Sequence, residues 1–210
     1  MIRILIADDH AIVRSGLKQI LEENPEMKIV AEHNNGSDVL NWLRTNKCDV
    51  VMLDIAMPGK SGIDVLKQLH EEKPKLPVLV ISIYPEDQYA VRLIRAGASG
   101  YLTKESAPEV VVEAVRQVAS GKKYISASVA EMLANEFGGQ TEKLPHQTLS
   151  DREYQIFLLL SSAKTPTEIA AALALSIKTI STYRSRILEK MHLRNNAELM
   201  RYAVDNHLIE

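Results

Sequence analysis

The sequence has little of several features that would assign it to a special class of protein. Its 210 residues include a single cysteine, Cys48, which excludes an intramolecular disulfide framework and fits a reducing compartment. No apolar run approaches the roughly 20 residues that a membrane-spanning helix needs. The opening MIRILIADDH is too short in its apolar part, and too acidic, to be a secretory signal. The sequence therefore predicts a cytoplasmic protein without a membrane partner.

Charge of one sign is also scarce. The 25 Lys and Arg residues against 27 Asp and Glu residues give a formal net charge of −2, so overall charge does not by itself indicate nucleic-acid binding. Any basic patch must therefore be local. Hydrophobic residues make up 46% and charged residues 25% of the chain, which is typical of a globular protein. This length suits one large domain or two small ones.

The first half alternates short apolar runs with stretches of helical periodicity. The runs predict strands at 2–7, 28–33, 50–54, 78–83 and 100–104. Apolar residues at spacings of three and four predict helices at 11–23, 36–46, 62–72, 86–97 and 107–121. Five strands alternating with five helices predict an α/β fold, a flavodoxin-like doubly wound five-stranded parallel sheet with helices on both faces.

The second half has a different pattern. Residues 126–137 predict one helix, and 138–147 have the Gly, Pro and polar content of a linker. After this, no strand pattern remains, and helices are predicted at 150–162, 166–174, 177–191 and 196–206. Ser150, Thr165 and Ser176 are the expected N-caps of the first three. The predicted organisation is an α/β domain at 1–121, a linker with a helix at 122–147, and an all-α four-helix domain at 148–210.

Polar residues stand where the predicted strands end. Asp8 and Asp9 end the first strand, Asp54 ends the third, Ser82 lies near the end of the fourth and Lys104 ends the fifth. Ligands of open parallel sheets bind at this edge, so we expect the three carboxylates to converge. Such like charges need a cation between them, and oxygen ligands favour Mg²⁺. A carboxylate beside Mg²⁺ and a lysine can attack a phosphoryl group.

Two other interpretations of these acids stay open at this point. Acidic residues at strand ends can serve as helix caps or as solvated charges. A metal-dependent phosphohydrolase would also use a nucleophilic aspartate at a strand end. Such a nucleophile is usually followed two residues later by a second acid, however, and Ala56 occupies that position.

Four segments of the first half resemble a known domain. ILIADDH, VVMLDIAMPGKSG, VLVIS and RAGASGYLTK are similar to the receiver domain of bacterial two-component response regulators, over residues 1–121. The resemblance implies that a sensor histidine kinase phosphorylates Asp54. It implies that Mg²⁺ is held by Asp8, Asp9, Asp54 and the backbone carbonyl of Ala56.

The same resemblance assigns three further roles. Lys104 would contact the phosphoryl group, and Ser82 with Tyr101 would form a switch pair in which Tyr101 turns inward. For Tyr101, an ordinary half-buried strand aromatic is the alternative. The receiver would catalyse only its own Mg²⁺-dependent phosphorylation and a slow loss of phosphate, so the chain would not be an enzyme in the usual sense.

The segment EIAAALALSIKTISTYRSRI (168–187) predicts two helices joined by a short turn. Ile180, Ile187 and Met191 fall on one side of the second helix. The opposite side carries small polar and basic residues, and between 176 and 191 basic residues outnumber acidic ones by four to one. Such a face suits a DNA major groove. The solvated face of a helical bundle is the alternative.

LSDREYQIFLLL, EIAAALALSIKTI and RILEKM resemble the C-terminal helix-turn-helix of NarL/FixJ (LuxR-type) regulators, over about 148–210. The resemblance implies that base edges face Ser181, Thr182 and Ser185, and that phosphates are held by Lys178, Thr179, Tyr183, Arg184 and Arg186. It implies promoter DNA as a partner and RNA polymerase as a further candidate. It also implies a homodimer in the active state, for which the candidates are Leu199, Tyr202 and Ala203; packing in the domain's own core is the alternative for these three.

Three positions depart from the LuxR-type pattern. Ala163 stands where the family usually has glycine, Thr165-Pro166 replace a Ser-Asn-like pair, and Tyr183 occupies a position that is commonly histidine. We expect these departures to affect DNA affinity and not the fold. They keep open a third interpretation, in which the helical half binds a partner other than DNA.

Overall fold

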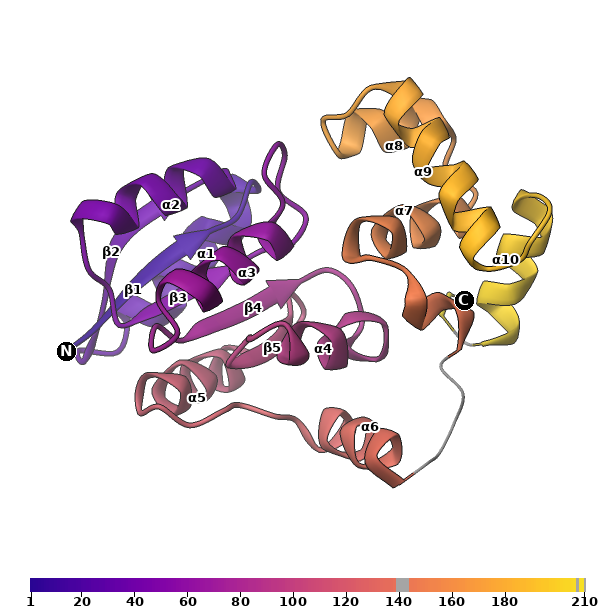
Figure 1. The fold of residues 1–210 in the computed structure, drawn as a ribbon. Coiled ribbons are helices and arrows are strands. Elements are labelled where there is room, and N and C mark those ends of the chain that lie inside the picture. Colours follow the sequence, from indigo (N-terminus) through magenta and orange to yellow (C-terminus); the bar gives the residue numbers. More distant parts are fainter. Residues whose placement is uncertain (139–143, 207, 210) are drawn as a thin grey trace. The chain divides into compact units, whose positions relative to one another are not determined.

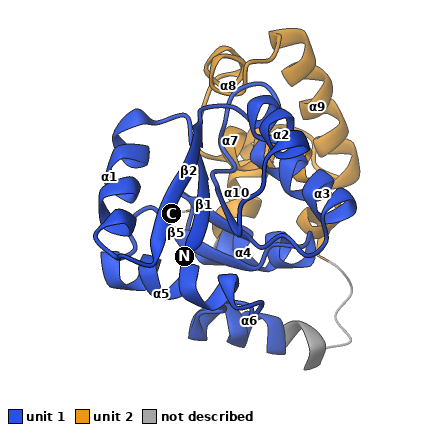
Figure 2. Cartoon of the chain, turned by 90° about the vertical axis from the view of Figure 1, so that its left-hand side faces the viewer, with its two compact units in different colours: residues 1–135 blue, residues 136–210 orange. Residues whose placement is uncertain are grey.

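The computed structural model describes residues 1–138, 144–206 and 208–209. The chain divides into two compact units, residues 1–135 and 136–210 (Figure 2), called here the sheet unit and the helical unit. The predicted domain limits, 1–121, 122–147 and 148–210, stay predictions. Part of the predicted linker, 139–143, lies outside the described residues. No described helix is both long enough and apolar enough to cross a membrane.

The sheet unit contains one parallel sheet (Figure 1), as predicted. Its strands are β1 (Ile2–Ala7), β2 (Met27–His33), β3 (Val50–Leu53), β4 (Val78–Ser82) and β5 (Gly100–Thr103). Their order is β2-β1-β3-β4-β5. β2 therefore lies on one side of β1, and β3, β4 and β5 follow on the other side. All four residues of β3 are buried, which is why this strand reads as a continuous apolar run.

Helices cover both faces of this sheet, as the alternating pattern predicts. The helices in this part of the chain are α1 (Ala11–Glu22), α2 (Gly36–Thr45), α3 (Gly62–Glu72), α4 (Glu86–Arg95), α5 (Pro108–Ala119) and, beyond the sheet, α6 (Ala127–Gly138). Figure 2 shows α1 and α5 on one face and α2 and α3 on the other. Ile4, Ile6 and Met52 of the strands pack with Val111 and Val115 of α5 in one hydrophobic core.

The start of α6 is attached to the sheet unit. The Tyr124 N–H donates to the Ser99 carbonyl over 2.8 Å, which extends the edge of the sheet beyond β5. The Ser126 hydroxyl donates to Glu86 Oε2 over 2.7 Å, at the first turn of α4. The helix predicted inside the linker is therefore present, and its first turn packs on the sheet unit.

The helical unit contains η1 (Pro145–Thr148), α7 (Asp151–Ser161), α8 (Pro166–Ala172), α9 (Ile177–Lys190) and α10 (Asn196–Asp205). Three predicted N-caps are confirmed, because Ser150, Thr165 and Ser176 each accept a hydrogen bond from a backbone N–H three residues later. Pro166 starts α8, where its missing N–H costs nothing.

Candidate functional site

The topology of the sheet brings the predicted carboxylates together. β1 pairs with β3 so that Ala7 lies beside Leu53, and the next residues of both strands, Asp8 and Asp54, are fully buried. Asp9 lies beside them and is partly exposed. The ligand atoms of these three carboxylates and of His10 all lie within 4.8 Å of one another.

Lys104 joins two of these acids. It follows β5, and its ammonium Nζ lies 2.7 Å from Asp8 Oδ2 and 2.7 Å from Asp54 Oδ2. Its side chain is only 8% exposed. The second oxygen of Asp54 accepts a hydrogen bond from the Ala56 N–H over 3.0 Å. Both carboxylate oxygens of Asp54 therefore have a partner.

Burial and the opposite charge of the partner shift the pKa values of Asp54 and Lys104 in opposite directions. Burial raises the pKa of Asp54, and the nearby Lys104 only partly offsets that effect. Burial also disfavours the charge on Lys104, but attraction to Asp54 and the hydrogen bonds to Asp54 and Asp8 outweigh burial, so the pKa of Lys104 is raised. Three carboxylates against one ammonium leave an excess of negative charge. Their oxygens suit a hard divalent cation.

The predicted switch residues lie close to this site. Ser82 is fully buried at the end of β4, and its hydroxyl oxygen accepts the Tyr84 N–H over 3.2 Å. The Tyr101 hydroxyl donates to the Tyr84 carbonyl over 2.7 Å. Tyr101 is only 2% exposed, so it is a fully buried strand aromatic and not a half-buried one, and its role in a switch pair stays a prediction. In this structure Tyr101 already points inward.

Sequence reasoning missed His10. Its Nδ1 lies 2.8 Å from Asp9 Oδ1 and 3.2 Å from Asp8 Oδ1. The available signal was its position directly after two aspartates that end a strand, immediately before α1 begins. Arg14, one turn into α1, was also missed; its guanidinium donates to the Asp8 carbonyl over 2.6 Å.

Gly62 lets α3 begin against the backbone of Asp54. A Cβ atom at this position would lie 1.9 Å from the Asp54 carbonyl oxygen, far inside van der Waals contact. The Gly62 N–H donates to the Ile55 carbonyl over 3.3 Å. The glycine in the motif PGKSG is therefore needed for close approach of two backbone segments.

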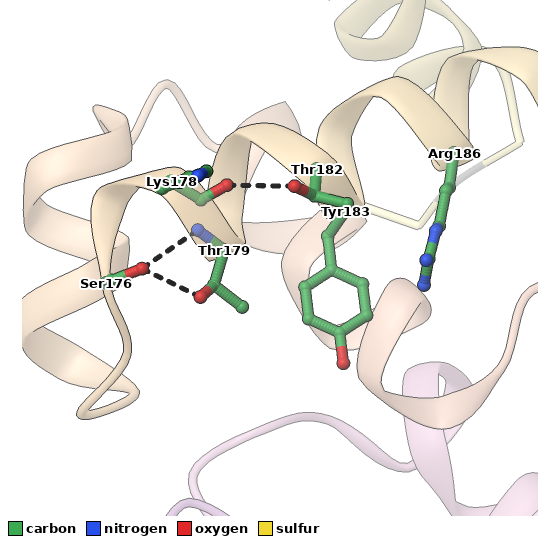
Figure 3. Close-up of a pocket in the computed structure, with 6 residues that line it drawn as sticks. All are labelled: Ser176, Lys178, Thr179, Thr182, Tyr183 and Arg186. Atoms are coloured by element: carbon green, nitrogen blue, oxygen red, sulfur yellow. Dashed lines mark hydrogen bonds between the residues drawn. The ribbon is translucent and has the colours of Figure 1, made fainter.

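The basic face predicted on the second helix of the pair lies on α9. Five of the predicted residues are exposed and three are half-buried. The exposed ones are Lys178, Ser181, Thr182, Ser185 and Arg186, and the half-buried ones are Thr179, Tyr183 and Arg184. Figure 3 shows the side chains of Tyr183 and Arg186 extending from the same side of the helix. They line a shallow cavity of about 350 Å³ with Ser176, Lys178, Thr179 and Thr182.

Local hydrogen bonds fix several of these side chains. The Thr182 hydroxyl donates to the Lys178 carbonyl over 3.0 Å, and the Ser185 hydroxyl donates to the Ser181 carbonyl over 3.2 Å. Their oxygens therefore remain as acceptors. Arg184 donates to Asn196 Oδ1 over 2.6 Å, which links α9 to α10. The structure therefore gives Arg184 an internal partner in addition to any phosphate.

For two of the three predicted dimer residues on α10 the structure favours the alternative of core packing, while Tyr202, which is half-buried, stays a prediction. Leu199 and Ala203 are fully buried in the helical unit's own core, because this side of α10 packs on α7. The Tyr202 hydroxyl lies 2.9 Å from His146 Nδ1, which fixes the η1 segment. The core-packing alternative holds for Leu199 and Ala203. The large apolar residues of α10 that are exposed are Met200 (38%) and Val204 (49%).

The departures from the LuxR-type pattern are accommodated differently. Ala163 has φ +60°, the left-handed region that favours glycine, so its side chain is strained there. Thr165 caps α8 normally: its N–H donates to Glu168 Oε2 over 2.8 Å, and the Glu168 N–H donates back to its hydroxyl. Pro166 therefore leaves the start of α8 intact.

A buried aspartate paired with a lysine at a sheet edge, together with a helix-turn-helix unit, defines a class of two-part regulator. The sequence matches the response regulator receiver domain over residues 4–116 and the luxR family of bacterial regulatory proteins over residues 147–203. The chain therefore belongs to the response regulators that join a receiver domain to a LuxR-type DNA-binding domain.

Full-length relatives support this assignment. The chain is 37% identical to the response regulator GacA of Pseudomonas aeruginosa, over 100% of this chain and 99% of that protein. It is 35% identical to the response regulator UvrY of Escherichia coli K12, over 99% of this chain and 96% of that protein. It resembles a structure of RcsB from Salmonella enterica serovar Typhimurium bound to promoter rprA with phosphomimetic BeF3⁻. That match has a TM-score of 0.66 and 25% identity, over 96% of this chain and 98% of that one.

Proposed function

We propose that Asp54 is the residue at which this response regulator is phosphorylated by a sensor histidine kinase. One observation carries the proposal: Asp54 is buried at the end of β3, between the Lys104 ammonium and the Ala56 N–H, beside two further carboxylates. The family controls transcription by binding DNA. The chain is not an enzyme in the usual sense, and its own chemistry would be limited to gaining and slowly losing one phosphoryl group.

Mg²⁺ is the proposed cofactor. Receiver domains of this type generally use Mg²⁺ in the phosphorylation site. The residues that would hold it are Asp8, Asp9, Asp54 and the backbone carbonyl of Ala56. When bound, the ion would supply positive charge that neutralises the oxygens of the phosphoryl group.

The remaining residues of the site have separate roles in the proposed step. A carboxylate oxygen of Asp54 forms a bond to phosphorus, while the bond from phosphorus to the donor histidine nitrogen breaks and that nitrogen keeps the electron pair. Lys104 moves from Asp54 toward the new phosphoryl oxygens and stabilises their charge. Ser82 donates its hydroxyl to another of these oxygens. Tyr101 keeps its inward position against the space behind Ser82.

On the helical unit, α9 is proposed to enter the major groove of promoter DNA. Ser181, Thr182 and Ser185 would face base edges, and the phosphates would be held by Lys178, Thr179, Tyr183, Arg184 and Arg186. Serine and threonine contact bases without a unique preference, so modest specificity for each half-site is expected. The active form would be a homodimer, for which Met200 and Val204 offer exposed apolar surface. RNA polymerase at the promoter is a further proposed partner, and the cytoplasm is the proposed location.

The first experiment measures intact mass after incubation with Mg²⁺ and acetyl phosphate. The expected result is a gain of one phosphoryl group that is absent without Mg²⁺ and absent in Asp54→Asn. Phosphorylation at another residue, or none from either acetyl phosphate or a panel of histidine kinases, would contradict the proposal. Continuous release of phosphate over many turnovers would favour the phosphohydrolase interpretation instead.

A second experiment addresses the helical unit. The phosphorylated full-length chain is used to select sequences from a DNA library, and binding is then measured against salt concentration. A selected site bound with a steep salt dependence is expected. Absence of any selected sequence and of salt dependence would favour a partner other than DNA.

A further inference from the structure

We propose that a cavity at the amino-terminal ends of β4 and β5 binds a small phosphorylated molecule, with its phosphate groups against three lysines and its body against an apolar wall. This basic cavity has a volume of about 440 Å³, within the roughly 300–1,000 Å³ of small-molecule sites. Because the strands are parallel, it lies at the opposite edge of the sheet from Asp54, and the inference does not depend on the proposed phosphorylation.

The charges around the basic cavity are of one sign. Its titratable lining residues are His70, Lys75, Lys122 and Lys123, and no described residue that lines it is acidic. Glu72, near His70 on α3, has a partner on its own helix, because its Oε1 accepts a hydrogen bond from Gln68 Nε2 over 2.6 Å. Three ammonium groups without a carboxylate favour an anion with two or more charges. Lysine binds phosphate groups in this way, as a point charge.

Lys123 shows this lack of a negative partner most clearly. Its ammonium Nζ donates to the carbonyl of the buried residue Ala98 over 2.7 Å. Burial lowers the pKa of Lys123, and no carboxylate of the described residues offsets that effect. A bound phosphate group would supply the missing negative charge and stabilise the ammonium form.

The backbone around Lys123 is fixed before any ligand binds. Gln117 Nε2 donates to the Lys123 carbonyl over 2.6 Å, and the next N–H, that of Tyr124, donates to the Ser99 carbonyl over 2.8 Å. The Ser99 N–H in turn donates to the Val78 carbonyl over 2.8 Å. A ligand would therefore meet a site that is already formed, which lowers the entropy cost of binding.

An apolar wall faces the same space. Pro74, Leu76 and Pro77, which lead into β4, line the basic cavity; Pro74 is exposed and the other two are half-buried. Covering this wall with the body of a ligand would remove apolar surface from water. An apolar wall with a few charged groups is the usual composition of a small-molecule site.

A structural role for the lysines is the competing explanation. In that case Lys123 only satisfies the Ala98 carbonyl in the turn after α4, and Lys75 and Lys122 are solvated charges. That explanation predicts no binding at the basic cavity beyond a general attraction of anions to positive charge, which any lysine of the chain would share.

The test uses the full, unphosphorylated chain without Mg²⁺, and two probes, adenosine diphosphate and inorganic pyrophosphate. Titration calorimetry measures the affinity, and the shifts of assigned backbone amide signals in nuclear magnetic resonance spectra locate the site. Adenosine diphosphate should shift the amide signals of Gly97, Ser99 and Gly121. It should bind more tightly than pyrophosphate, because its base and ribose cover the apolar wall.

Paired substitutions separate a site from general charge attraction. Lys75 and Lys122 are exposed, so Lys75→Gln with Lys122→Gln should leave the fold intact and weaken binding of adenosine diphosphate at least about tenfold. The matched control, Lys28→Gln with Lys47→Gln, removes two exposed lysines outside the basic cavity and should change the affinity less than twofold.

Three results would contradict the proposal. Absence of binding by both probes, or amide shifts confined to α9, would show that the basic cavity is not a site. Equal losses of affinity in the two paired variants would show only general charge attraction. Equal affinities for the two probes would overturn the assigned role of the apolar wall.

Discussion

The acidic site and the basic face of α9 are built in different ways. Asp8, Asp54 and Lys104 follow three different strands and meet only because β1 and β3 are neighbours and β5 ends at the same edge of the sheet. The proposed DNA-contacting residues all lie on one helix of 14 residues. Long-range topology thus assembles the first site, and helical periodicity alone assembles the second.

This difference has energetic consequences. Asp8 and Asp54 are fully buried, so each charged group there depends on its partners for stability. Lys178 and Arg186 are exposed, so replacing them removes a contact to a ligand but no support for the fold. Substitutions should therefore affect folding at the first site and only affinity at the second.

Lys104→Met should give the largest loss, about 4 kcal/mol in the free energy of unfolding of the sheet unit, because Asp8 and Asp54 remain buried without their cation. Since Asp54 already has a raised pKa, its protonation at low pH removes the unpaired charge, and the loss should shrink as the pH falls. Fluorescence of Trp42, the chain's single tryptophan, during urea unfolding reports on this unit. Lys178→Met is the control and should change stability by less than about 0.5 kcal/mol. Equal losses in both variants would show that the buried acidic site and the exposed face of α9 do not differ in their contribution to stability.

The next largest change in stability is expected on the buried side of α10. Leu199→Ala should lower the free energy of unfolding of the helical unit by about 3 kcal/mol, because a fully buried side chain leaves a cavity. Met200→Ala, one residue away and exposed, should cost less than about 0.5 kcal/mol. Circular dichroism during urea unfolding measures both. A larger loss of stability for Met200→Ala than for Leu199→Ala would show that Leu199 is not in the core, and Leu199 would again be a candidate for the dimer contact.

Gly62→Ala should destabilise the sheet unit by about 2 kcal/mol, because the new methyl group meets the Asp54 carbonyl oxygen. Gly16→Ala in α1 is the matched control: no atom lies within 4 Å of its Cβ position, so helix propensity should make it stabilising by up to about 1 kcal/mol. Trp42 fluorescence during urea unfolding measures the stability of both variants. Similar shifts in the same direction would show that the approach of α3 to Asp54 does not require glycine.

Arg186→Ala should weaken binding to the selected DNA site about tenfold and reduce the slope of the salt dependence by about one. The weakening should be similar for all sequences, because a phosphate contact does not read bases. Fluorescence anisotropy against salt concentration measures it. Arg201→Ala, which removes an exposed arginine from α10, is the charge-matched control and should leave affinity unchanged; equal losses would indicate a nonspecific charge effect.

The smallest expected change is an increase in stability. Ala163→Gly should raise the free energy of unfolding of the helical unit by about 0.5 kcal/mol, because the left-handed backbone at φ +60° is strained for alanine. Ala171→Gly, inside α8, should lower it by about 1 kcal/mol. Thermal unfolding followed by circular dichroism compares them. If both variants lose stability alike, Ala163 is not strained.

Most elements of the fold could be predicted because their signals are local. The apolar runs located all five strands, and the spacing of apolar residues located the helices, with ends that differ by one or two residues. Ser150, Thr165 and Ser176 marked three helix starts correctly, because an N-cap depends only on the next three residues.

The helical periodicity of α10 could not separate core from surface. Leu199, Met200, Ala203 and Val204 are all apolar, and only the packing of α10 on α7 decides that the first and third are buried while the other two are exposed. Tyr101 presents the same problem, since neither its burial nor the hydrogen bond from its hydroxyl to the Tyr84 carbonyl can be read from the residues next to it.

The sequence by itself determined the order of the elements, the strand-end positions of Asp8, Asp54 and Lys104, and the basic side of α9. These follow from short apolar runs, from the helical period of 3.6 residues and from caps, all of which act over a few residues. The tertiary structure alone decided the distances from Lys104 to two carboxylates, the direction of His10 toward Asp9, and the buried face of α10. Each of these joins groups whose approach depends on how strands and helices pack, and no local pattern of residues records that packing.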